Sequence, residues 1–342
     1  MLWCRLAVSA ETLFMRGHHQ TSKITRPLTA GAPWPPLSRR QAMCPTPLLP
    51  GATLVPRRSV TTGTAGWYEG LADSSAVHLT EGLLVSAQSA TGLPWWASIA
   101  VTTVALRTVI TLPLGVYQSL IIAKVEALQV EIAQLAKRLH YEVSVRTKEK
   151  GWTQKTARYQ FKKNLRRIVS ELYVRENCHP FKASLLVWVQ LPMWVCVTLA
   201  LRNLSLGAAH SPPVYEDLAV GGALWFSDLT LPDSTWLLPI SLGLVNLLIT
   251  EIFALRRIQA SKFQRYVTHF IRGISLLMVP IAATVPSSMA VYWLSSSVIG
   301  LGHNLLVCSP RFRRLCRLPP TRVDSDTPYR DLAAAFVSKY LK

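Results

Sequence analysis

Arg107 lies within a long apolar stretch, where an ionisable side chain is costly and therefore informative. The stretch from Trp95 to Tyr117 holds no other charged residue, and a guanidinium in hydrocarbon carries a large insertion cost. We therefore expect Arg107 to face protein or water, and we interpret it as part of a hydrated groove that attracts acidic or polar groups. Two alternatives stay open: the side chain could extend to a nearby membrane interface, or it could pair with Glu251.

The apolar stretches carry few other groups that could do chemistry. They hold scattered hydroxyl and amide side chains, namely Thr102, Thr103, Thr108, Thr111, Gln118, Gln190, Thr198 and Asn246. Such groups usually hydrogen-bond within helix bundles. The matched carboxylates of an ion-coupled transporter, a complete protease motif and a nucleotide-binding motif are all lacking in the sequence. We therefore expect no enzymatic activity and no direct coupling to ATP.

The cysteines indicate neither a disulfide framework nor a metal site. They are Cys4, Cys44, Cys178, Cys196, Cys308 and Cys316. No two of them form a CxxC pair, and the first two fall in a segment that we expect to be removed. Cys178 and His179 are two adjacent candidate ligands, but a third is not evident. No cofactor or metal is expected.

Composition and charge distribution indicate a membrane protein. The 342 residues are 50% hydrophobic and only 16% charged, whereas a soluble domain has about 25% charged residues. The net charge of +19 could suggest a nucleic-acid partner. However, Lys and Arg are absent from 59–106 and from 203–235 and dense over 124–182. Alternation of basic and base-free segments is typical of membrane topology, so nucleic acid is not expected as a partner.

The first 58 residues have the composition of a mitochondrial presequence. They contain eight basic residues and one acid: Arg5, Arg16, Lys23, Arg26, Arg39, Arg40, Arg57 and Arg58 against Glu11. An Arg-rich, acid-poor start with an apolar stripe is typical of such targeting segments. We expect 1–58 to comprise the presequence and a Pro-rich disordered segment; a basic disordered tail is the alternative.

The hydropathy pattern predicts an all-α protein with five membrane spans, each long enough or nearly long enough to cross about 30 Å of hydrocarbon. They lie at about 95–117, 181–201, 236–255, 269–285 and 289–307. Pro286 separates the last two, because proline interrupts a helical hydrogen-bond ladder. Their shortness implies tilt or a locally thinned bilayer. Together they form a core over 95–308.

Positive charge predicts how the spans are oriented. The basic segments are 124–182, 256–272 and 311–342, and the segment before the first span, the loop after the second and the turn after the fourth lack Lys and Arg. The basic side should face the mitochondrial matrix. The mature N-terminus, with 59–94, would then lie in the intermembrane space, and the short basic tail 309–342 in the matrix.

Residues 119–179 are expected to form an antiparallel coiled-coil hairpin. Apolar residues follow at steps of three and four in two runs: Ile121, Val125, Leu128, Ile132, Leu135 and Leu139, then Phe161, Leu165, Ile168 and Leu172. Gly151 interrupts the pattern, and Thr153 is a candidate N-cap for the second helix. Two helices lying on the bilayer surface are the alternative. A short amphipathic helix is also expected over Glu81–Leu93.

Four segments in order resemble the YidC/Oxa/Alb family of membrane-protein insertases. They are Val104–Leu114, Gln190–Trp194, Trp225–Ile240 and Pro286–Trp293, and the resemblance covers about residues 67–308. It is nearest to the mitochondrial branch that serves cytochrome c oxidase assembly. This branch implies an inner-membrane protein that exports the C-terminal domain of oxidase subunit two. Unlike the Oxa branch, the chain has no long basic tail, so stable ribosome docking is not expected.

The resemblance also implies a site. Arg107 matches the groove arginine of the family, and we place Thr103, Thr111 and Gln190 with it in the client-binding groove. Spans two and four match the walls of a hydrophobic slide, to which we assign Met193, Trp194, Leu277, Met278 and Ile281. The lipid bilayer is a further partner, and other oxidase assembly factors could join. The rival functions are a non-translocating assembly factor and a solute transporter.

Overall fold

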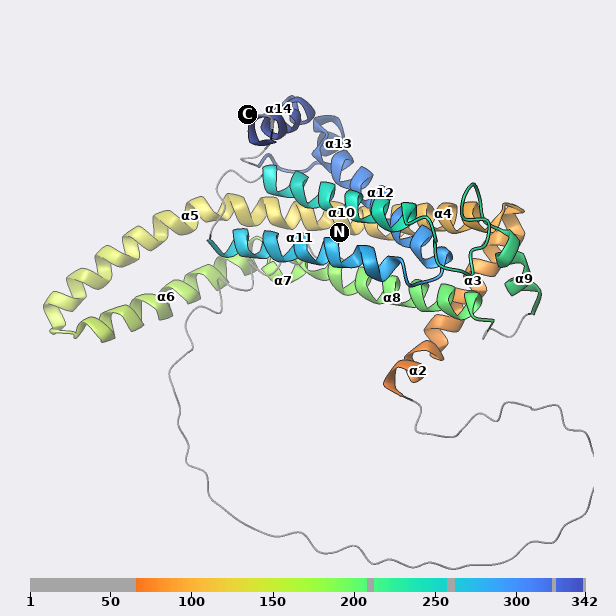
Figure 1. The fold of residues 1–342 in the computed structure, drawn as a ribbon. Coiled ribbons are helices and arrows are strands. Elements are labelled where there is room, and N and C mark those ends of the chain that lie inside the picture. Colours follow the sequence, from red (N-terminus) through yellow and green to blue (C-terminus); the bar gives the residue numbers. More distant parts are fainter. Residues whose placement is uncertain (1–65, 208–211, 257–261, 322–323, 341–342) are drawn as a thin grey trace, which may run out of the picture.

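The computed structural model describes residues 66–207, 212–256, 262–321 and 324–340, and these form a helical bundle (Figure 1). The expected presequence lies outside the described residues. The first helices are α2 (Trp67–Ala72) and α3 (Ser75–Thr91). The amphipathic helix expected over Glu81–Leu93 thus falls mainly in α3, which begins earlier and ends at the left-handed Gly92.

The first span is part of a long helical run that changes pitch at Arg107. It comprises α4 (Trp95–Leu106), a π-helical turn η1 (Arg107–Thr111) and α5 (Leu112–Lys150). The Leu112 N–H donates to the Arg107 carbonyl, five residues back. Pro113 explains the wide turn, because it has no N–H to donate and its ring crowds the carbonyl four residues earlier. Single π-helical turns are frequent at functional sites.

Helices α5 and α6 (Gln154–Arg175) form a hairpin that projects from one end of the bundle (Figure 1). Gly151 ends α5 with a φ of +61°, and the Thr153 hydroxyl accepts a hydrogen bond from the Thr156 N–H, so the expected break and N-cap are confirmed. The expected seam residues are all buried or half-buried, Ile121 and Leu172 among them. That the pair is a coiled coil stays a prediction.

Four helical segments in the described residues are long and apolar enough to cross a membrane. They are Trp95–Lys150, Phe181–Ser205, Leu237–Leu255 and Ser287–Cys308. They comprise the α4–η1–α5 run, α7 (Pro180–Ala183) with α8 (Leu185–Ser205), α10 (Leu237–Leu255) and α12 (Ser287–Cys308). The stretch expected as the fourth span lies in α11 (Lys262–Ala282), which is not among these four. The expected first, second, third and fifth spans therefore have matching helices. The expected fourth span, over 269–285, stays a prediction.

The loop before α10 is tied to the start of α12. The Ser287 N–H and hydroxyl both donate to the Leu231 carbonyl, at 2.8 and 2.7 Å, and the Ser288 N–H donates to the Leu229 carbonyl. Asp233 caps α10 by accepting from the Leu238 N–H at 2.8 Å. Burial acts to raise the pKa of Asp233, but the hydrogen bonds it accepts hold that pKa below its ordinary value. α9 (Pro212–Val220) precedes this loop.

Helix α12 lies at the centre of the bundle, because it packs against α4, α8 and α10. α11 packs mainly on α10. After α12 the chain forms α13 (Pro310–Leu315) and α14 (Pro328–Tyr340), and α14 contacts α10. The carboxy-terminal segment thus returns to the membrane helices rather than simply extending from them.

Candidate functional site

Arg107 points into the bundle at α12. Its side chain is only 5% exposed, and its Nη2 donates a hydrogen bond to the hydroxyl of Ser296. Its carbonyl accepts from the Thr111 hydroxyl at 2.7 Å, within the π-helical turn. The turn therefore fixes the backbone below the guanidinium, and α12 fixes the guanidinium itself.

A small pocket opens beside Arg107 between three helical segments. It is lined by Arg107, Thr111, Leu112, Gly115, Leu186, Gln190, His303 and Val307. These residues come from the η1–α5 run, the start of α8 and the end of α12. The pocket therefore lies in the half of the bundle from which the α5–α6 hairpin projects. Its polar groups include a guanidinium, an amide and an imidazole, which can donate hydrogen bonds to the oxygens of a carboxylate or a carbonyl.

The expected groove residues are brought together in part. Thr111 and Gln190 line the same pocket as Arg107. Thr103 lies one turn earlier, is buried, and donates to the Ile99 carbonyl at 2.6 Å within its own helix. Thr103 is not among the residues that line the pocket. Its role in client binding stays a prediction without this geometric support.

The expected slide residues divide into packed and outward-facing side chains. Trp194 stacks on Trp293 with ring centroids 5.7 Å apart. Met278 packs against the cluster of buried apolar residues to which Trp293 belongs. Met193 is half-buried. Leu277 and Ile281 on α11 are 59% and 40% exposed, as lipid-facing apolar residues would be. The α11 part is thus more accessible than the α8 part.

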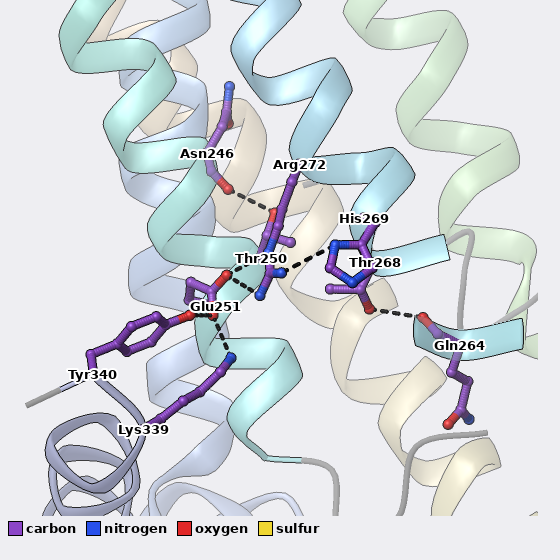
Figure 2. A network of polar contacts seen from close by, with 9 residues as sticks. All are labelled: Asn246, Thr250, Glu251, Gln264, Thr268, His269, Arg272, Lys339 and Tyr340. Atoms are coloured by element: carbon purple, nitrogen blue, oxygen red, sulfur yellow. Dashed lines mark hydrogen bonds and ion pairs between the residues drawn. The ribbon is translucent and has the colours of Figure 1, made fainter. Parts of the chain in front are cut away.

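Glu251 is held by a different network, on α10 (Figure 2). Its carboxylate accepts from Arg272 Nε at 2.6 Å, from Lys339 Nζ at 3.0 Å and from the Tyr340 hydroxyl. These partners come from α11 and α14. The alternative that Glu251 neutralises Arg107 is therefore wrong. Glu251 on α10 is paired with residues of α11 and α14, whereas Arg107 donates to Ser296 on α12.

His303 is a polar residue of the pocket that the sequence analysis missed. It lies on α12, is half-buried, and its Nε2 is 3.5 Å from the Thr108 hydroxyl on η1. A signal was present, because an ionisable residue within a membrane span is by default a candidate functional residue. Ser296 was missed for a simpler reason: serine is common in spans and gives no sign of which helix it faces.

The described residues form a bundle of helices with a pocket beside a buried arginine and a projecting hairpin, and four helical segments are long and apolar enough to cross a membrane. A family model described as 60Kd inner membrane protein matches residues 86–313. The chain therefore belongs to this family, as the resemblance to the YidC/Oxa/Alb insertases implied.

Individual relatives are similar over most of the chain. The mouse protein named cytochrome c oxidase assembly protein COX18, mitochondrial, is 61% identical over 81% of this chain and 84% of its own length. The human protein of the same name is 57% identical over 86% of this chain and 89% of its own. The mitochondrial inner membrane protein OXA1 of Arabidopsis thaliana is 29% identical over 72% of this chain and 53% of its own.

Proposed function

We propose that this chain is a membrane-protein insertase of the mitochondrial inner membrane that takes part in cytochrome c oxidase assembly. Its client would be oxidase subunit two, whose C-terminal domain it would move from the matrix to the intermembrane space. Family membership and the names of the COX18 relatives support oxidase assembly. The observation that carries the insertase mechanism is Arg107, a buried cation beside a pocket whose lining combines Thr111, Gln190 and His303 with apolar residues.

The proposal includes the topology expected from the charge pattern. α11 would be the fourth of five spans, because the half that follows Arg272 is apolar and the basic residues Lys262, Arg265 and Arg272 all lie between its beginning and its midpoint. The α5–α6 hairpin and the tail would lie in the matrix, and α3 in the intermembrane space. The hairpin would be a coiled coil that helps to receive clients, and 1–58 would be the presequence.

The mechanism is energetic and needs no catalytic group. Unsatisfied backbone groups of a client each cost several kcal/mol in hydrocarbon, so an unaided polar segment does not cross. A groove that is wet from the matrix and open to lipid shortens the dry path, and short spans thin the bilayer further. Arg107, Gln190 and Thr111 would attract the polar segment. Exposed apolar residues such as Leu277 and Ile281 would take the client helix along the slide.

The charge of Arg107 can be tested by substitution in mitochondria. Arg107→Ala should accumulate subunit two with its C-terminal domain still in the matrix, as measured by protease protection in mitoplasts. Arg107→Lys should retain part of the export, because it keeps the charge but not the planar donor set. Normal export by Arg107→Ala would remove this charge from the mechanism.

A complete knockout tests the wider assignment. We expect loss of both subunit two export and oxidase assembly. If export proceeds and only assembly is lost, the chain is a non-translocating assembly factor. If both proceed, the insertase assignment itself is wrong.

A further inference from the structure

His303 and Ser296 share one face of α12 and meet η1 at two points. They are seven residues apart, which is about two helical turns or about 10 Å along the axis. Ser296 accepts from the Arg107 guanidinium, and His303 Nε2 lies 3.5 Å from the Thr108 hydroxyl. The guanidinium and the imidazole are therefore anchored at different depths of the same helix pair.

The order of the two groups follows from the direction of α12. This helix begins at Ser287, beside the loop that precedes α10, and ends at Cys308, in the half of the bundle from which the hairpin projects. His303 is thus nearer to the hairpin end than Ser296. A segment that enters the pocket from the hairpin side would meet the imidazole before the guanidinium.

We propose that His303 is a second client-binding residue, which contacts carboxylates of a client segment at the mouth of the groove before they reach Arg107. The inference rests on the proposed insertase function and names the chemistry of its client. The imidazole and the Gln190 amide both line the pocket and can donate to carboxylate oxygens. An apolar residue would fill this position of a membrane span at lower cost, so an ionisable side chain there indicates a binding role.

Site-specific photocrosslinking in the full-length protein in mitochondria tests the contact. Probes at positions 303 and 107 should both crosslink to a newly made client that carries an acidic exported segment. A probe at Leu306 is the matched control, because Leu306 lies on the same helix, is 39% exposed and does not line the pocket. Crosslinks from 107 without crosslinks from 303 would overturn the role of His303 and leave the insertase function standing.

Substitutions test whether the contact serves carboxylates. His303→Leu should lower export of the acidic client by about tenfold or more, the effect of one lost hydrogen bond to a charged group. Export of the same client with Asp and Glu changed to Asn and Gln should fall much less. His303→Gln, which keeps a donor, should restore most of the export, and Leu306→Ala should change neither client. Equal losses for both clients would show packing rather than recognition and would contradict the proposal.

The two proposals fail in different ways. If knockout mitochondria export both clients normally, the insertase function falls, and the role of His303 falls with it. If the knockout blocks export but His303→Leu and His303→Gln export the acidic client at the wild-type rate, only the role of His303 is wrong.

Discussion

Arg107 and Glu251 both lie on helices of the membrane bundle, but they are held in opposite ways. Arg107 donates to the neutral hydroxyl of Ser296 and lines a pocket. Glu251 binds counter-charges from two other helices, Arg272 on α11 and Lys339 on α14 (Figure 2). A charge that is neutralised by fixed partners stabilises an arrangement of helices, whereas a charge beside a pocket can act on a passing ligand.

The contrast extends to the parts of the chain that each charge joins. The Glu251 network connects α10, α11 and α14, so it fixes one wall of the bundle to the carboxy-terminal helix. The Arg107 site lies between the η1–α5 run, the start of α8 and the end of α12. Mutations in the Glu251 network are therefore expected to lower the free energy of unfolding. Mutations at the Arg107 site are expected to lower export of the client.

The largest expected effect on stability is that of Glu251→Ala. Removal of one partner from a partly buried ion pair leaves the other charge uncompensated, and we expect the free energy of unfolding in bicelles to fall by about 2–3 kcal/mol. Arg272 is the side chain left behind, at 27% exposure. Limited proteolysis should also show earlier cleavage of the tail that follows α12.

The double variant Glu251→Leu/Arg272→Leu is the matched control. Replacement of both charges by apolar residues leaves only Lys339 without its counter-charge, and at 40% exposure this side chain is solvated, so most of the lost stability should return. If the double variant is less stable than either single variant, the network is not a coupled ion pair and the contrast with Arg107 fails.

A smaller effect on stability, but a large one on export, is expected for Arg107→Leu. An apolar residue at this buried site avoids the cost of desolvating a guanidinium, so the free energy of unfolding should change by less than about 1 kcal/mol. Export of subunit two should nevertheless be lost. Both quantities are to be measured on the same variant, by denaturation in bicelles and by protease protection.

Leu106→Ala provides the reverse control. Leu106 is half-buried against the cluster of buried apolar residues that contains Ile99 and Trp293, one residue before Arg107. Truncation of a core leucine costs about 2 kcal/mol or more when it is fully buried, and we expect a loss of stability with export retained per folded molecule. A loss of stability for Arg107→Leu as large as that for Glu251→Ala would assign both charges to structure.

The sequence predicted the helices and their breaks well, because these depend on local features. Thr153 caps α6 and Pro286 precedes α12, as expected from capping and from the missing proline N–H. The same local chemistry could have predicted the π-helical turn at Arg107, since Pro113 is its cause, but a hydropathy pattern does not distinguish helix types.

Contacts between helices could not be predicted in the same way. Glu251 was considered as a partner of Arg107, yet Arg272 lies only 21 residues from it along the chain and α14 supplies two further donors. Periodicity shows which face of a helix is apolar, not which helix that face meets. Ser296 in particular could not be singled out, because nothing in the sequence shows that its helix α12 lies opposite η1.

The smallest expected effect is that of Lys339→Met, which removes the outer partner of Glu251. Hydrogen bonds with Tyr340 and Glu251 raise the pKa of Lys339 above its ordinary value. Because the pKa of Lys339 is higher in the folded chain than in the unfolded chain, the stabilisation is complete at pH values below the unfolded-chain pKa of Lys339. It is lost as the pH rises through the folded-chain pKa of Lys339. Docking of α14 should therefore be constant through neutral pH and weaken only in strongly alkaline solution.

The side chain of Lys339 is 40% exposed, so solvent and salt should screen its attraction to Glu251. Lys339→Met should cost less than about 1 kcal/mol, and less still at high salt. Hydrogen exchange of the α14 amides at low and high salt would measure this loss of stability. Lys262→Met is the control, because Lys262 is a basic residue at the start of α11 that is not a partner of Glu251. A salt-independent loss as large as that of Glu251→Ala would mean that α14, rather than Arg272, is the main partner of the Glu251 carboxylate.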